Sequence, residues 1–148
     1  MILGDTRLEL PDGWTCVSAI FAAPPSASAP ALPSNAKPVD FRSTVSLAFE
    51  EVPPGTTAQG FLDAQLKHLR AAGEQIKLNA TQPIPGRSDD ALLADMAMVG
   101  PRGEHLRQIE AIAVRGTRAG MAVASFLDDE RAKEWEKHLR PALERALP

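Results

Sequence analysis

Residues Ser43–Gly73, STVSLAFEEVPPGTTAQGFLDAQLKHLRAAG, join a strand, a sharp turn and an amphipathic helix in one run. The strand shows the period-two alternation of an element with one buried face. Its apolar members are Val45, Leu47 and Phe49. Pro-Pro-Gly at 53–55 ends the strand, and Thr56 or Thr57 can then cap a helix. The apolar stripe of that helix consists of Phe61, Leu62, Leu66 and Leu69.

The rest of the chain predicts more strands and one more helix. Strands over 7–10 and 14–21 precede the opening stretch, and strands over 75–82, 91–99, 104–115 and 119–126 follow it. The loop Gly100-Pro101-Arg102-Gly103 lies between two apolar runs, which indicates a hairpin. A last helix begins at Asp128 or Asp129, and Pro141 predicts a kink or break near 138–139.

This pattern predicts an α+β fold. We expect a mainly antiparallel sheet of about six or seven strands with two helices packed on it, in the order β-β-loop-β-α-β-β-β-β-α. The 148 residues form one domain, 1–148, that is long enough to bury a core. Residues 22–38 are rich in proline, alanine and serine, and we expect them to form a surface loop within that domain.

Composition argues against several classes of function. The formal net charge is −3 with both signs interspersed, so the basic stripe that nucleic acid requires is missing. No apolar run approaches a membrane span, which argues against direct membrane insertion. The first residues carry no leader pattern, so we expect a cytoplasmic protein. The single cysteine, Cys16, cannot form an internal disulfide.

Residue types that perform chemistry are scattered. The three histidines, His68, His105 and His138, show no metal-ligand spacing. Neither a glycine elbow around a serine nor a glycine-rich phosphate loop is present. We therefore expect no catalytic residue, no metal site and no cofactor, and we predict that the protein is not an enzyme.

The last three predicted strands are apolar on both faces, a pattern typical of strands that are covered on both sides. Two interpretations are open. Each helix covers one face, or one small, alanine-rich face is a platform for another chain. Gln108 is a polar residue within one of these strands. Its amide pairs within the layers, faces a polar group on a partner, or is solvated.

Several segments together resemble a known family. They are L-x-L-P-D-G-W at 8–14, V-S-L-A-F-E-E-V-P-P-G-T at 45–56, F-L-D-A-Q-L-K-H-L at 61–69, L-R-Q-I-E-A at 106–111, and a closing helix with Trp135. The chain resembles the DcrB-related family of the PsbP-like fold, and within it the Eag-type effector chaperones of bacterial type VI secretion. The proline-rich loop at 22–38 is longer than that family's pattern.

The resemblance implies a non-enzymatic chaperone or adaptor. Such a protein is a homodimer that holds the hydrophobic N-terminal segment of a secreted effector in an apolar groove. The resemblance places the partner-binding positions on small or apolar outward residues and one amide. These are Leu93, Ala97, Leu106, Gln108, Ile112, Ala122 and Ala124. The alternative is a PsbP-like interaction module, or an immunity-type inhibitor, that binds a folded partner through its loops.

Overall fold

The computed structural model describes residues 2–3, 6–7, 18–22, 43–87 and 89–147. Its elements are β1 (Ile2–Leu3), β2 (Thr6–Arg7), β3 (Ser18–Ala22), β4 (Thr44–Glu51), α1 (Ala58–Ala71), β5 (Ile76–Pro83), β6 (Asp90–Val99), β7 (His105–Arg115), β8 (Arg118–Leu127) and α2 (Ala132–Ala146). Residues 23–38 of the predicted surface loop lie outside the described residues, as does Cys16.

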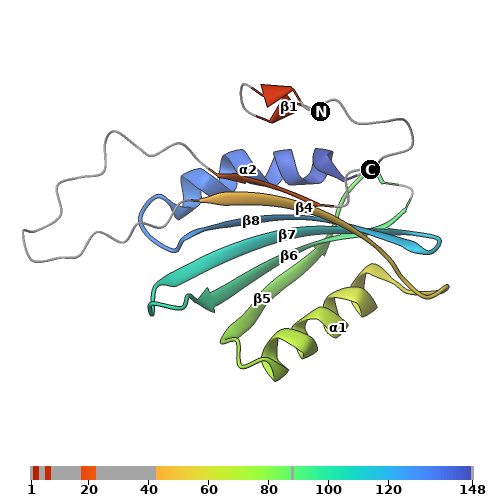
Figure 1. The fold of residues 1–148 in the computed structure, drawn as a ribbon, viewed down its shortest axis with the longest axis horizontal. Helices are drawn as coiled ribbons and strands as arrows, with labels where there is room; N and C mark the ends of the chain where they lie inside the picture. Colours follow the sequence, from red (N-terminus) through yellow and green to blue (C-terminus); the bar gives the residue numbers. More distant parts are fainter. Residues whose placement is uncertain (1, 4–5, 8–17, 23–42, 88, 148) are drawn as a thin grey trace, which may run out of the picture.

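One antiparallel sheet organises the described part of the chain (Figure 1). Its six strands run in the order β3-β4-β8-β7-β6-β5, while β1 and β2 pair separately. The strands β5 to β8 follow one another as neighbours, whereas β4 pairs with β8 and β3 forms the outer edge. The predicted α+β class, with a mainly antiparallel sheet and two helices, is confirmed.

The opening stretch folds as its pattern predicts. Thr57 is the N-cap of α1, and its hydroxyl accepts a hydrogen bond of 3.0 Å from the backbone N–H of Gly60. After the helix, Gly73 has φ of +89°, a left-handed conformation that glycine adopts without strain. The strand and the helix are thus separated by a capped turn, and the chain leaves α1 toward β5.

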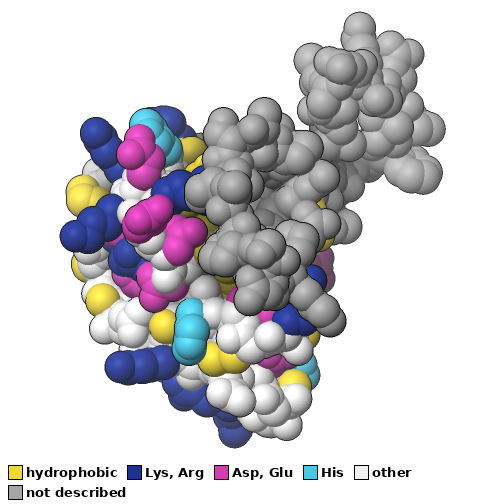
Figure 2. Space-filling model, turned by 90° about the vertical axis from the view of Figure 1, so that its left-hand side faces the viewer, with side chains coloured by type: hydrophobic (Ala, Val, Ile, Leu, Met, Phe, Trp, Pro, Cys, Tyr) yellow, Lys and Arg dark blue, Asp and Glu magenta, His cyan; other side chains and the backbone are white. Residues whose placement is uncertain are grey.

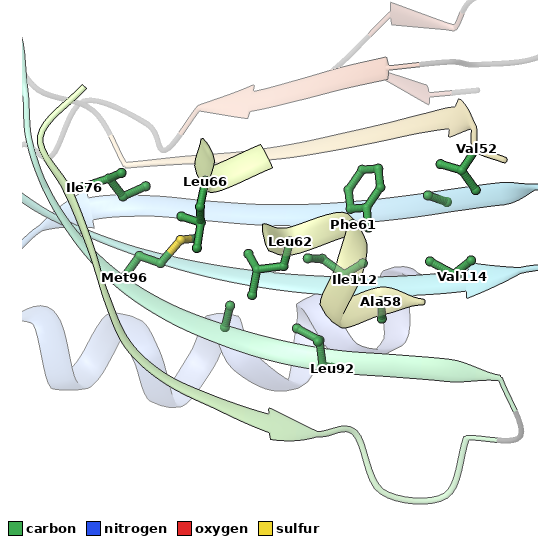
Figure 3. Packing of buried hydrophobic residues seen from close by; sticks show 12 residues of the cluster. Val52, Ala58, Phe61, Leu62, Leu66, Ile76, Leu92, Met96, Ile112 and Val114 are labelled. Carbon is green, nitrogen blue, oxygen red and sulfur yellow. The ribbon is translucent and has the colours of Figure 1, made fainter. Parts of the chain in front are cut away.

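The helix α1 packs on one face of the sheet through its apolar stripe. Figure 3 shows Phe61, Leu62 and Leu66 pointing from α1 toward strand residues that include Met96 and Ile112. The helix contacts β5, β6 and β7. We call the side of the sheet that carries this helix the α1 face.

The opposite face of the sheet, the α2 face, carries α2. Leu143 of α2 is fully buried in a cluster with Ile109 and Phe126. The helix contacts β7 and β8, and it runs unbroken across Pro141. Of the kink or break predicted near 138–139, the break is therefore wrong. The buried Leu143 follows Pro141 by two residues, and its packing holds the last turn against the sheet.

An ion-pair network also joins α2 to the sheet. Arg107 on β7 donates hydrogen bonds to Asp95 on β6, at 3.2 and 2.5 Å, and forms a 2.9 Å ion pair with Glu136 on α2. Glu136 in turn pairs with Arg140 at 2.6 Å. Desolvation would raise the pKa of Asp95, but the hydrogen bonds and charge of Arg107 outweigh it and lower that pKa. The charged atoms are therefore paired where the helix meets the sheet.

Candidate binding surface

The first interpretation of the two-faced strands is correct for most of the sheet, because α1 and α2 lie on opposite faces (Figure 1). The helix α1, however, packs on β5, β6 and β7. It does not cover the part of the α1 face that is formed by β3, β4 and the second half of β8. Strand pairing places several residues of these three strands on the α1 face. We call six residues of that face the open patch: Ile20, Ser46, Ala48, Val123 and Ser125 from these strands, and Gln108 from the neighbouring strand β7.

The register assigns these residues to the α1 face. Ile20 pairs with Ser46, Ser46 with Val123, and Val123 with Glu110. Glu110 in turn pairs with Ala94, which belongs to the core beneath α1. Directly paired residues in an antiparallel sheet project to the same side, so this row crosses the sheet on one face.

The open patch combines apolar and polar side chains that are exposed or half-buried. Ile20 is 74 % exposed, the one large hydrophobic side chain exposed in the described residues. Ser46 and Ala48 on the neighbouring strand β4 are half-buried, as are Val123 and Ser125 on β8. Small side chains let another backbone approach closely, and hydroxyl groups can bond to polar groups of a ligand. The patch therefore suits an apolar segment that carries some polar atoms.

A buried polar pair borders the open patch. The carboxyl of Glu110 is 1 % exposed, and Gln65 of α1 lies beside it. The Nε2 atom of Gln65 donates to the sulfur of Met121 at 3.7 Å. The Oε1 atoms of both Gln65 and Glu110 are buried without a hydrogen-bond partner. Unsatisfied buried oxygens are costly, and this pair is the weak point of the packing beneath α1.

Burial raises the pKa of Glu110 to about 7, and hydrogen bonding to Gln65 lowers it by a smaller amount. The residues opposite Glu110 on the neighbouring strands are Ala94 and Val123, neither of which carries a charge. A protonated carboxyl is a hydrogen-bond donor, which the unpaired oxygen of Gln65 lacks. Protonation of Glu110 therefore removes the cost of burying its charge and supplies a donor beside Gln65.

The seven residues predicted to bind a partner do not share one face and most are buried, so the expectation that they are outward-facing positions is wrong. Leu106, Gln108 and Ile112 lie on the α1 face, whereas the other four lie on the α2 face. Those four are Leu93, Ala97, Ala122 and Ala124. The cause is register: Ala122 pairs with Ala111 and not with Ile112, so even-numbered residues of β7 and β8 project to opposite sides.

Burial separates the seven residues further. Leu93, Leu106, Ile112, Ala122 and Ala124 are all buried. Gln108 is half-buried and belongs to the open patch. Ala97 is also half-buried, and it lines a hollow of about 330 Å³ at the end of β5, β6 and β7, together with His105. Of the predicted residues, only Gln108 therefore lies on the surface that we regard as the candidate site.

Sequence reasoning missed Ile20 and Glu110. Ile20 is an apolar residue in a short edge strand, and only its register with Ser46 reveals the face on which it lies. Glu110 had a signal in the sequence, because this charged residue lies between Ile109 and the apolar run AIAV at 111–114. A charged residue in a strand that is apolar on both faces lies either at the exposed edge of a packed face or buried beneath a helix. Which of these applies to Glu110 depends on the position of α1.

The described residues show two further properties of the surface. Figure 2 shows acidic and basic side chains interspersed on the face it presents. Within the described ranges, no three His, Cys, Asp or Glu side chains come together in a group that could hold a metal ion. Neither α1 nor α2 is long and apolar enough to cross a membrane.

Comparison with known proteins identifies the fold. Neither protein-family models nor curated proteins match the sequence. The structure is similar to that of PA94 from Pseudomonas aeruginosa, a protein of unknown function considered a candidate regulator. The TM-score is 0.67 and the identity 17%, over 100% of this chain and 94% of that one.

A second similar structure is cyanobacterial PsbP (CyanoP) from Synechocystis. The TM-score is 0.54 and the identity 12%, over 72% of this chain and 66% of that one. The chain thus has a PsbP-like fold, which confirms the fold that the resemblance implied.

Proposed function

We propose that this protein is a non-enzymatic chaperone or adaptor that binds an apolar helix of a secreted effector for type VI secretion. The observation that carries the proposal is the open patch on the α1 face. Ile20 is 74 % exposed there, and half-buried Ala48 lies on the neighbouring strand β4, with half-buried Val123 one strand further on β8. An exposed isoleucine with half-buried apolar residues on the adjoining strands offers apolar surface that another chain can bury.

The chemistry of the patch supports a helix as its occupant. An apolar helix buries its side chains against Ile20 and Val123, and each Å² removed from water contributes about 25 cal/mol before the cost of association. The hydroxyls of Ser46 and Ser125 and the amide of Gln108 lie within the same patch. These side chains can form hydrogen bonds with serine, threonine or backbone groups of the helix. An entirely apolar surface would leave those groups of the helix unpaired.

The experiment is co-expression with the product of the neighbouring gene that carries an apolar N-terminal segment. Affinity purification of that segment is expected to recover the wild-type chain. Ile20→Asp and Val123→Asp are expected to reduce the recovered amount about tenfold or more, because a charge would be buried against the apolar helix. Ala142→Asp, on the exposed side of α2, is the matched control and should leave recovery unchanged.

The thermal midpoint of each variant is measured first, so that loss of binding is separated from loss of folding. Ile20 is largely exposed, and Ile20→Asp should therefore keep the wild-type midpoint. Recovery of Ile20→Asp and Val123→Asp at the wild-type level would contradict the proposal, as would the absence of a neighbouring product with an apolar segment. The proposal includes the homodimer implied by the resemblance, which light scattering of the purified chain tests.

A further inference from the structure

A cavity of about 300 Å³ lies on the opposite face of the sheet from the open patch. Its lining includes Phe49, Ala113 and Gly120, from β4, β7 and β8. Ala113 belongs to the cluster beneath α2, which places the cavity on the α2 face at the end where β7 turns into β8. The volume is that of a small-molecule pocket at the lower end of the usual range.

Two arginines stand at this cavity. Arg115 and Arg118 are directly opposite each other in the β7–β8 ladder, and both line the cavity. Like charges placed directly opposite in a sheet are destabilising, so this arginine pair lowers the stability of the hairpin. Uncharged residues at the two positions would form the same hairpin without that repulsion. Local conflicts of this kind are expected at functional sites.

The carboxylates of the described residues do not neutralise both arginines. Asp89 lines the cavity with a side chain 4 % exposed, and it already accepts two hydrogen bonds from Arg87, at 2.7 and 2.5 Å. Arg115, with a side chain 72 % exposed, is 3.5 Å from the same carboxylate. Arg118 forms no ion pair within the described part of the chain, although Glu51 is opposite it on β4.

The lining favours one class of ligand. Phe49, Ala113 and Gly120 supply an apolar wall, and the two guanidinium groups supply the planar donors that match a carboxylate. Asp89 stays ionised because its hydrogen bonds with Arg87, and the nearby positive charges, hold its pKa below the ordinary range. Its negative charge repels every anion and most strongly a polyanion such as a polyphosphate, so of the anionic ligands the lining favours one with a single negative charge.

We propose that this cavity binds a small monocarboxylate with an apolar body, its carboxylate held by Arg118 and Arg115 and its body against Phe49. The site is separate from the open patch, because the sheet lies between them. The proposal therefore stands whether or not the chain binds a secreted effector.

The test is a titration of the full chain with octanoate, followed in ¹H–¹⁵N spectra at the amides of Ala113 and Gly120. Saturable shifts are expected there. Arg118→Gln is expected to weaken octanoate binding about tenfold or more, because a charge-assisted hydrogen bond is lost. Arg70→Gln changes an exposed arginine in the last turn of α1 and should leave the affinity unchanged. Octan-1-ol, the neutral analogue, should bind at least about tenfold more weakly.

Four results would overturn the proposal. The first three are the absence of saturable shifts at the two amides, equal octanoate affinity in wild type and Arg118→Gln, and octan-1-ol binding as tight as octanoate. Shifts confined to Val123 and its neighbours would also overturn it, because they would place octanoate on the open patch. Arg118 is exposed, so its replacement is expected to leave the fold intact, and the spectrum of the free variant verifies this.

Discussion

Glu110→Gln is expected to remove a pH-dependent loss of stability that the wild type carries. Burial raises the pKa of Glu110 from 4.5 to about 7 in the folded chain. Well below pH 4.5 the carboxyl is protonated in both states and contributes no difference. As the pH rises from there toward 7, the unfolded chain ionises first, so unfolding becomes more favourable. Above about pH 7 the folded carboxyl ionises too, and the loss is complete.

The magnitude follows from the size of the shift. A difference of 2.5 pKa units, from 4.5 to about 7, corresponds to roughly 3 kcal/mol at about 1.36 kcal/mol per unit. Roughly 2.5 kcal/mol of this is lost between pH 5 and pH 8, since part of the titration precedes pH 5. Glutamine keeps the size of the side chain and has no charge to bury, so it removes this loss. It also supplies an N–H donor for the unpaired oxygen of Gln65.

The assay is urea unfolding of wild type and Glu110→Gln at intervals from pH 5 to pH 8. The free-energy difference between the two chains should grow by roughly 2.5 kcal/mol in favour of the variant over this range. The comparison cancels the contributions of histidines, which titrate in both chains. Glu74→Gln, at an exposed position after α1, is the control and should follow the wild-type profile. A difference that stays constant across the range would refute the reasoning.

Three further changes test other parts of the fold. Thr57→Ala removes the hydroxyl that caps α1 and should lower the free energy of unfolding by about 1 kcal/mol in urea titrations. Arg107→Ala leaves the carboxylates of Asp95 and Glu136 without their shared partner, and about 2 kcal/mol should be lost at pH 7, measured in the same way. Leu143→Ala opens a cavity beneath α2 and should cost about 3 kcal/mol, visible as a lower thermal midpoint.

Each of these changes has a control and a contradicting outcome. Thr57→Ser keeps the capping oxygen, and equal stability of Thr57→Ala and Thr57→Ser would refute the capping argument. For Arg107, the loss should shrink as the pH falls below the ordinary range of aspartate, because the lowered pKa of Asp95 contributes stability only above it. A pH-independent loss would contradict the ion pair. For α2, the control is Ala146→Gly at an exposed position. Leu143→Ala should lower the thermal midpoint clearly more than this control, and equal midpoints would contradict the packing argument.

The sequence by itself determined the elements and their class. Alternation at Val45–Phe49 and the stripe from Phe61 to Leu69 are local properties, and the structure contains a strand and a helix there. Capping by Thr57 is equally local, because the hydroxyl bonds to an N–H three residues away. The hairpin around residues 100–103 is of the same kind, since its turn residues lie between adjacent strands.

The candidate sites were decided by the tertiary structure. Ala122 and Ile112 are both apolar residues in neighbouring strands, and only the register shows that they face opposite sides. The burial of Glu110 depends on α1, which comes from a segment some forty residues earlier in the chain. The exposure of Ile20 depends on which strands that same helix covers. Period-two alternation specifies which residues of one strand share a face. Each face is buried by a helix that is distant in the sequence, and no local pattern indicates which strands that helix contacts.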